Sequence, residues 1–221
     1  MTSCPATTTA PIPTPTYGHG GSFSIRCSPC HIAATPQACL DAVVTAADYP
    51  SWNRFCRRCT IDAQPPDCKD DPSRLQLGTR FTFDVHLDPD EPDAAPPGQV
   101  VALEVSVLEA IDDDDDHNDD GGDEAAAVPD SSRPRRRKGW RIAWKPRQTS
   151  VFMPGWMLRS ERVQQFVEVE AGTEYECYET FYGVLAPVLW MAVSKKVERG
   201  FEAWAEGLKG WVEGRKQGRT A

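Results

Sequence analysis

The stretch WMAVSKKVERGFEAWAEGLKGW, residues 190–211, decides the fold of this chain of 221 residues. Large apolar side chains recur in it at intervals of three and four: Trp190, Val193, Val197, Phe201, Trp204, Leu208 and Trp211. This interval places them on one stripe of an α-helix, which we expect to run from about Pro187 to Gly214. Glycines at 200, 207 and 210 each weaken such a helix by roughly 1 kcal/mol relative to alanine. A broad apolar surface elsewhere in the chain must therefore hold it.

Composition excludes several classes of protein. The net charge of −9 and the sequence pI near 5.0 argue against a nucleic-acid binder. The sequence shows no apolar run long enough for a transmembrane segment and no signal-peptide pattern at its start. We expect a cytoplasmic protein with one core of ordinary size.

The expected domain organisation has four parts. Residues 1–21, rich in Thr and Pro, are predicted to be a disordered tail, and residues 214–221 a second tail. Residues 22–213 form a single domain, interrupted by a disordered charged insertion at 112–138. The basic cluster Arg133–Lys138 in that insertion is either a nuclear-import signal or a solvated loop partly neutralised by its acidic half.

Between the tail and the last helix, the sequence predicts one strand, then two short helices, and then further strands. Phe23, Ile25 and Cys27 alternate with polar residues, and Thr35-Pro36 is a helix start. Residues 52–55 make a second short turn or helix. Further strands with one apolar face are predicted around residues 81–87, 101–107, 140–144, 159–169 and 174–182.

The last two strands are joined by a turn at Ala171-Gly172, which predicts that Glu170 faces Thr173. One face then carries Glu161, Val163, Gln165, Val167 and Val169 beside Glu176, Tyr178, Thr180 and Tyr182. This face has more apolar bulk, so we assign it to the interior and place Arg162 and Glu179 diagonally on the outer face. A bulge of one residue in the turn would exchange the two faces.

Several short motifs carry a family resemblance. They are Ile32-Ala33-Ala34-Thr35-Pro36-Gln37, Asp48-Tyr49-Pro50-Ser51-Trp52-Asn53, Leu77-Gly78-Thr79-Arg80, Ser160-Glu161-Arg162 and Glu179-Thr180-Phe181-Tyr182-Gly183-Val184-Leu185. In order and spacing, over about residues 22–213, the chain resembles the SRPBCC superfamily of START-like and polyketide cyclase/dehydrase-like domains. The resemblance implies an α+β helix-grip fold. In that fold a curved antiparallel β-sheet wraps a long C-terminal α-helix and encloses a hydrophobic cavity, with two short helices after the first strand.

The first functional hypothesis is binding or transport of a hydrophobic small molecule, such as a lipid, a sterol or a polyketide-like compound, in that cavity. Each aromatic side chain taken singly is also consistent with plain core packing. The expected ligand-binding residues are Trp52, Phe81, Phe83, Trp140, Trp144, Trp156, Val163, Gln165, Tyr182, Val197, Phe201 and Trp204.

The second hypothesis is a cofactor-independent cyclase, dehydratase or isomerase. Glu161, if it points inward, would be the general acid or base, and Tyr178 and Tyr182 would donate hydrogen bonds to a guest carbonyl. The competing interpretation puts Glu161 at the cavity mouth, paired with Arg159. Whether the protein is an enzyme stays open at this point.

A third hypothesis treats Cys27, Cys30, Cys56 and Cys59 as a zinc site of an interaction module. Otherwise the eight cysteines are expected to be reduced thiols, because no secretion signal is seen. Nothing in the sequence requires a cofactor. The expected partner is a hydrophobic small molecule rather than a nucleic acid, and transient contact with a membrane is compatible with the sequence. Oligomeric state is not indicated.

Overall fold

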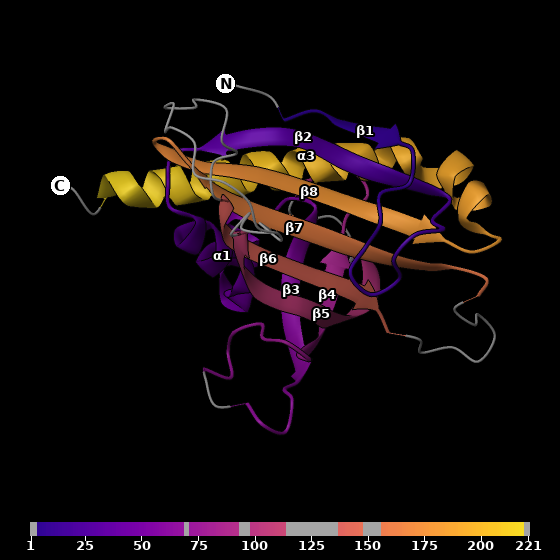
Figure 1. The fold of residues 1–221 in the computed structure, drawn as a ribbon, viewed down its shortest axis with the longest axis horizontal. Coiled ribbons are helices and arrows are strands. Elements are labelled where there is room, and N and C mark those ends of the chain that lie inside the picture. The colour runs from indigo at the N-terminus through magenta and orange to yellow at the C-terminus, as the bar shows by residue number, and fades with distance from the viewer. Residues whose placement is uncertain (1–3, 69–70, 93–97, 114–136, 148–155, 219–221) are drawn as a thin grey trace, which may run out of the picture.

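The fold is seen in a computed structural model that describes residues 4–68, 71–92, 98–113, 137–147 and 156–218 (Figure 1). The elements in chain order are β1 (Ala6–Thr9), β2 (Phe23–Ile32), α1 (Pro36–Val44), a 3-10 turn (Ala46–Asp48), α2 (Tyr49–Trp52), β3 (Cys56–Ala63), β4 (Arg80–Val85), β5 (Gln99–Asp113), β6 (Arg137–Pro146), β7 (Arg159–Val169), β8 (Gly172–Tyr182) and α3 (Ala186–Gly218).

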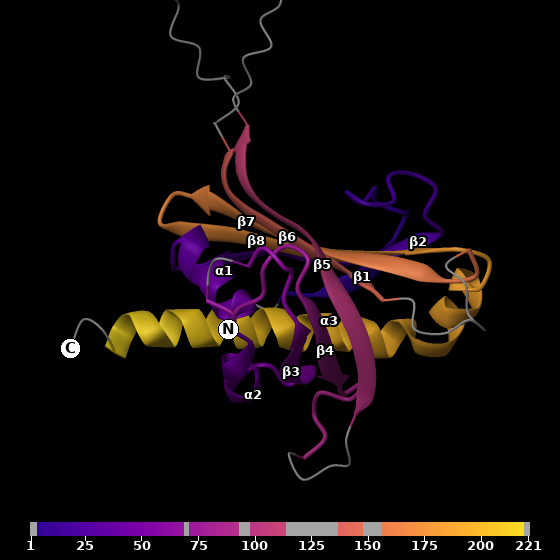
Figure 2. The same ribbon diagram turned by 90° about the horizontal axis from the view of Figure 1, so that it is seen from below.

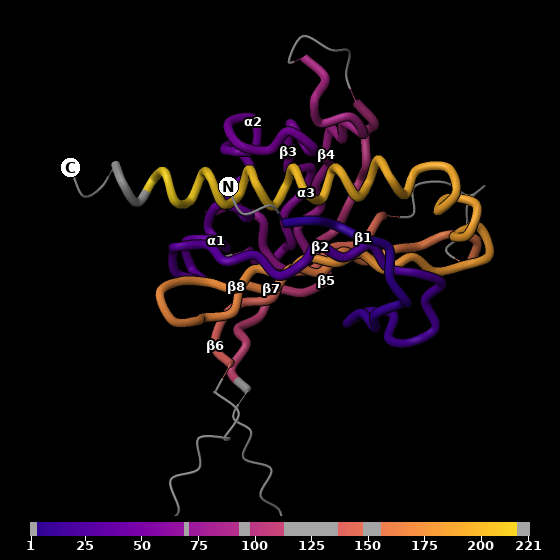
Figure 3. Tube along the Cα trace, turned by 90° about the horizontal axis from the view of Figure 1, so that it is seen from above, coloured from indigo at the N-terminus to yellow at the C-terminus, as the bar shows by residue number. Residues whose placement is uncertain are grey.

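All eight strands form one antiparallel sheet in the order β1-β2-β8-β7-β6-β5-β4-β3. The sheet bends round α3, so that β7 and β8 lie on one side of the helix and β3 and β4 pass along another (Figures 2 and 3). The predicted helix-grip fold, with two short helices after the first predicted strand, is confirmed.

The core of the molecule lies where α3 meets the sheet and α2. Phe201, Trp204 and Leu208 are fully buried, and the Trp204 ring lies 5.3 Å from that of Trp52 and 5.9 Å from that of Trp144. Two of the helix glycines are explained by this packing. A Cβ at Gly200 would lie 2.4 Å from the Phe55 ring, and one at Gly207 would lie 2.2 Å from a main-chain oxygen. These glycines weaken the helix but allow α2 and the start of β3 to approach it closely.

Residues 4–21 of the N-terminal segment pack on the domain, where a disordered tail was predicted for residues 1–21. Thr8 donates from its main-chain N and its Oγ1 to Glu198 on α3, at 2.9 and 2.7 Å, and Ala6 N donates to Glu202 at 2.9 Å. Composition misled the prediction because this segment is held mainly by pairing with β2 and by hydrogen bonds to carboxylates of the distant helix, while only small side chains such as Cys4 and Ala6 enter the core.

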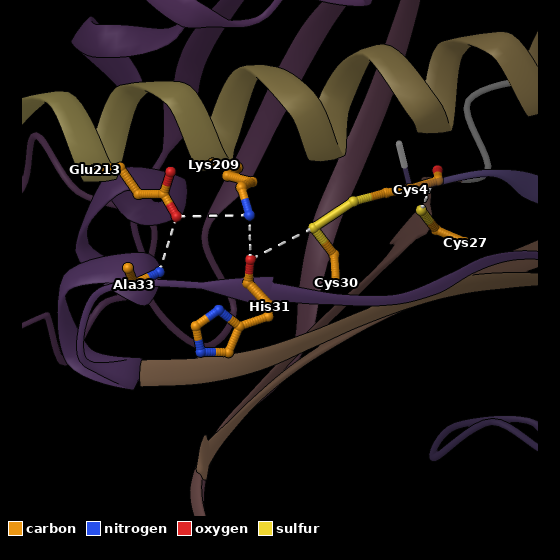
Figure 4. Close-up of a disulfide and its surroundings, with 7 residues drawn as sticks. All are labelled: Cys4, Cys27, Cys30, His31, Ala33, Lys209 and Glu213. Atoms are coloured by element: carbon orange, nitrogen blue, oxygen red, sulfur yellow. Dashed lines mark hydrogen bonds and ion pairs between the residues drawn. A yellow bond between two sulfur atoms is a disulfide. The ribbon is translucent and has the colours of Figure 1, made fainter. Parts of the chain in front are cut away.

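A disulfide between Cys4 and Cys30 joins this segment to β2, below the C-terminal half of α3 (Figure 4). The expectation of reduced thiols is therefore wrong for this pair. Beside it, Glu213 accepts from Ala33 N at 2.9 Å, and Lys209 donates to the main-chain oxygen of His31. These contacts fix the end of β2 against α3.

The predicted charged insertion lies mostly outside the described residues, as do residues 133–136 of the basic cluster. What is described are its two ends, where Asp112 on β5 pairs with Lys138 on β6 in the sheet. At the other predicted boundary, α3 continues past Gly214 to Gly218.

Candidate functional site

The two faces of the β7–β8 pair are the first feature that positions a site. The register joins Val169 to Gly172 and Arg162 to Glu179, so the predicted pairing of Glu170 with Thr173 was displaced by two residues. A shift of two leaves the membership of each face unchanged. The faces were assigned to the wrong sides, however, because the Arg162 guanidinium lies 4.0 and 4.3 Å from the ring centroids of Phe201 and Trp204 on α3. The Arg162 face is the inner one.

Glu161 consequently lies on the outer face, under the N-terminal strap, the name used here for residues 10–18. It is fully buried there. Its carboxylate accepts from Thr16 N at 2.8 Å, from Thr16 Oγ1 at 2.6 Å and from Ser106 Oγ at 2.5 Å. Figure 2 shows this N-terminal region on the side of the sheet away from α3. The prediction that Glu161 points into the cavity is therefore wrong.

The tyrosines grouped with Glu161 meet the same strap. Tyr178 Oη donates to the main-chain oxygen of Pro13 at 3.1 Å, and burial raises the pKa of Tyr178 to about 12. Tyr182 Oη donates to the oxygen of Gly18 at 2.9 Å and also contacts Thr14 Oγ1. Both hydroxyls are thus engaged by the strap, on the face away from α3.

The inner face carries a polar group of its own, made of Arg162, Gln164, Tyr175, Cys177 and Glu179. Arg162 Nε donates to Cys177 Sγ at 3.2 Å, and Tyr175 Oη donates to Gln164 Oε1 at 2.7 Å. Burial raises the pKa of both Cys177 and Glu179, while Arg162 beside them lowers it. Among the residues that the structure describes, Arg162 Nη2 and Gln164 Nε2 are buried without a hydrogen-bond partner. Alternation along the two strands puts these five residues on one face, which is the face of Arg162 and Glu179 that was predicted to be the outer one.

Six of the expected ligand-binding aromatics form a packed cluster between the sheet and α3. Neighbouring ring centroids lie 5.0 to 5.9 Å apart, and the members are Trp52, Phe81, Phe83, Trp144 and Trp204, with Phe201 buried beside them. Edge-to-face contacts at these distances are those of a close-packed core. These side chains fill the space that was expected to hold a guest.

The other expected ligand-binding residues are scattered. Val163 and Tyr182 lie on the outer face, as does Gln165, which pairs with Glu176. Val197 and Trp140 are half-buried against the core, and Trp156 is 66% exposed. The twelve residues do not converge on one cavity.

An open pocket of about 1080 Å³ is found instead at the end of the molecule where α1, the β7–β8 turn and the last turns of α3 meet. Its apolar lining comprises Ala34, Pro36, Ala38, Ala42, Val169, Ala171, Trp211 and Val212. We call it the end pocket. A smaller hollow of about 370 Å³ adjoins it, shares Thr35, Pro36 and Glu168 with it, and includes Trp140.

Four of the five charged side chains at the end pocket form ion pairs, and Glu168 is the exception among the described residues. Arg215 donates to Asp48 at 2.9 Å and lies 4.6 Å above the Trp211 ring, while Arg74 pairs with Asp41. Trp211 belongs to the apolar stripe that the sequence showed. It was not selected as a ligand-binding residue, because its position at the far end of α3 gave no sign that a pocket opens there.

The cysteines do not support the zinc hypothesis. Cys30 is bonded to Cys4, and Cys27 Sγ donates to the main-chain oxygen of Cys4 at 3.1 Å. Within the described ranges, no group of three or more Cys, His, Asp or Glu side chains could hold a metal ion. Over the same ranges, no helix is both long enough and apolar enough to span a membrane.

Comparison with known proteins starts from the sequence. No family model matches the chain. A curated relative, oxopyrrolidines biosynthesis cluster protein O of Penicillium oxalicum, is 28% identical over 193 residues, which cover 84% of each protein.

Solved structures resemble most of the chain. A hypothetical protein of Helicobacter pylori is 16% identical with a TM-score of 0.56, over 93% of this chain and 98% of that one. The Zhui aromatase/cyclase of Streptomyces sp. R1128 is 11% identical with a TM-score of 0.53, over 87% and 94%. A START superfamily protein of Mycobacterium smegmatis is 17% identical with a TM-score of 0.50, over 86% and 97%. The chain thus has the START-like helix-grip fold that was expected from its motifs.

Proposed function

We propose that the protein binds a hydrophobic small molecule in the end pocket. The observation that carries the proposal is the pocket itself, whose volume of about 1080 Å³ is at the upper end of the range typical of small-molecule sites. Binding there differs from the site first expected, which lay between the sheet and α3 and is filled by aromatic side chains.

The lining indicates the kind of guest. Ala38 and Ala42 on α1 and Val212 on α3 offer a smooth apolar wall, and Trp211 adds a flat aromatic face. Asp41 and Asp48 at the rim are paired with Arg74 and Arg215, whereas the lining carboxylate of Glu168 has no ion pair among the described residues, so the pocket disfavours an anionic guest. These features suit a guest with a flat apolar body and neutral polar groups.

The comparisons support the same class of guest. The curated relative is named for an oxopyrrolidine biosynthesis cluster, and one structural neighbour is an aromatase/cyclase. We therefore propose that the natural guest is a biosynthetic intermediate with a flat apolar body and neutral polar groups, rather than a membrane lipid.

The test is a substitution that fills the end pocket. Ala38→Trp places a large ring inside the lining, and we expect it to weaken binding of the neutral dye Nile red at least 10-fold. Ala192→Trp makes the same change at an exposed position on α3 and serves as the matched control. Both variants should melt as cooperatively as the wild type. Equal dye affinity in the wild type and the Ala38→Trp variant would refute the end pocket as the site.

A second candidate, cyclisation with loss of water from a polyketide-like guest, has one observation in its favour. Arg162 holds a buried Nη2 with no partner among the described residues, and such a group could polarise a guest carbonyl that reached the inner face. Under this candidate, Arg162→Lys would abolish conversion of a linear poly-β-ketone thioester while leaving dye binding intact. Unchanged conversion in that variant would exclude Arg162 from the reaction.

A further inference from the structure

An exposed apolar patch lies at the start of α3, at the opposite end of the helix from the end pocket (Figure 1). Its members are strongly exposed for side chains of their type: Met191 73%, Trp156 66%, Val184 66%, Val188 56% and Trp190 44%. Leu185 N donates to the main-chain oxygen of Met157 at 2.9 Å, which brings the residues before β7 to the start of the helix. We call these five residues the α3-start patch.

The patch has no part in the core. Val188, Met191 and Lys195 follow one another at intervals of three and four, so they share the face of α3 that points to solvent. The core-facing side chains further along the helix, Phe201 and Trp204, are buried. Contiguous exposed apolar residues of this size mark an interaction surface in soluble proteins.

The charge around the α3-start patch indicates which partner the patch binds. Residues 156–160 and 183–197 contain Arg159, Lys195 and Lys196 and no acidic residue, although the whole chain carries a net charge of −9. The next residue, Glu198, is buried, and its carboxylate is held by Thr8 and Lys195 rather than presented beside the patch. Lys195 is thus paired with Glu198, and Arg159 and Lys196 are the cations of this end without an ion pair among the described residues, which leaves it with a local positive charge.

We infer that the α3-start patch docks onto the surface of an anionic lipid bilayer. Tryptophan, methionine and valine side chains beside lysines are the composition with which helices lie in a membrane interface, the rings at the headgroup level and the cations on the lipid phosphates. Because the end pocket lies at the other end of α3, a docked molecule keeps that pocket away from the bilayer. Contact of the patch with the bilayer therefore anchors the protein, and the guest does not pass through this contact.

The experiment is co-sedimentation of the full chain with vesicles. One set is pure phosphatidylcholine and the other contains phosphatidylserine and phosphatidylcholine in a ratio of about 3:7. We expect at least 5-fold stronger partitioning onto the anionic vesicles and its loss in high salt, since the lysines contribute by long-range attraction. Failure of the wild type to sediment with anionic vesicles would overturn the inference.

Matched variants test the patch itself. Val188→Asp with Met191→Asp should lower partitioning at least 10-fold, whereas Val100→Asp, at a position on β5 that is 73% exposed, should not change it. All three positions are on the surface, so the variants should fold as the wild type does. Equal partitioning of the double variant and the control would refute the patch.

Self-association of the wild type without vesicles, abolished in the double variant, would overturn the lipid surface in favour of a second copy of the chain. Ala38→Trp should leave partitioning unchanged, which separates this inference from the proposed end pocket.

Discussion

Glu161 and Arg162 are adjacent on β7, both are buried, and their surroundings are opposite. Glu161, on the outer face, accepts three hydrogen bonds from Thr16 and Ser106. Arg162, on the inner face, lies over the rings of Phe201 and Trp204 and leaves Nη2 without a partner among the described residues. The outer charge is satisfied by polar contacts from a covering strap, whereas the inner charge is held chiefly by aromatic faces and a neighbouring thiol.

This difference shows that a buried position does not identify the inner side of the sheet. Both faces of β7 and β8 are covered, one by α3 and the other by the N-terminal strap. The outer side combines a small apolar cluster at Val163 and Tyr178 with hydrogen bonds from the strap, whereas the inner side is held mainly by close-packed aromatic rings. Mutations can therefore test the two faces separately.

The largest effect is expected on the inner side. Trp204→Ala removes a fully buried ring from the aromatic cluster and should lower the free energy of unfolding by about 4 kcal/mol. Trp190→Ala on the same helix, where the side chain is 44% exposed, should change it by less than about 0.5 kcal/mol. Urea denaturation followed by circular dichroism measures both. A similar loss in the two variants would mean that the inner cluster is not the core.

A smaller effect is expected on the outer side. Glu161→Gln replaces a carboxylate that accepts three hydrogen bonds, and should cost about 2 kcal/mol of unfolding free energy. Glu170→Gln, in the exposed β7–β8 turn, is the control. The dye affinity of the folded Glu161→Gln protein should equal that of the wild type, because the side chain lies away from the end pocket. A selective loss of dye binding would contradict this placement.

The smallest expected change in unfolding free energy comes from Glu198 and should depend on pH. Burial opposes ionisation of Glu198, but hydrogen bonds from Lys195 and Thr8 outweigh it and hold its pKa below the usual value. A lowered pKa in the folded state stabilises the protein above the ordinary pKa of glutamate, and this contribution is lost as the pH falls through the folded pKa. Glu198→Gln should therefore cost about 1 kcal/mol at pH 7 and less near pH 3. Urea midpoints at the two pH values decide it, and an equal deficit at both would show that the charge is not responsible.

Much of the fold could be predicted from the sequence, because its helices and strands follow from periodic patterns of neighbouring residues. The stripe from Trp190 to Trp211 predicted the long helix, and alternation in residues 81–85 and 159–169 predicted strands. The Thr35-Pro36 start is where α1 begins, with Thr35 Oγ1 accepting from Ala38 N. Such signals depend on near neighbours in the chain, and tertiary contacts did not override them.

The predictions that failed concerned features that depend on contacts with residues distant in the sequence. β1 is ordered through Glu198 and Glu202, more than 180 residues away, which no local pattern reveals. The two faces of β7 were separated correctly, but counting apolar bulk could not tell which one the helix covers, because the strap buries the other. The end pocket is formed by the end of α3 together with α1 and the β7–β8 turn, and its lining alanines carry no signal of their own.

The contacts of Ala6 and Thr8 with α3 also bear on how the protein avoids aggregating. β1 is the last strand on one side of the sheet, and a free strand edge exposes N–H groups on which a strand of another molecule can add. Here the N–H groups of Ala6 and Thr8 are already occupied by Glu202 and Glu198. The helix gripped by the sheet thus blocks the edge that would otherwise template strand addition, and it does so with two carboxylates that also repel an approaching acidic chain.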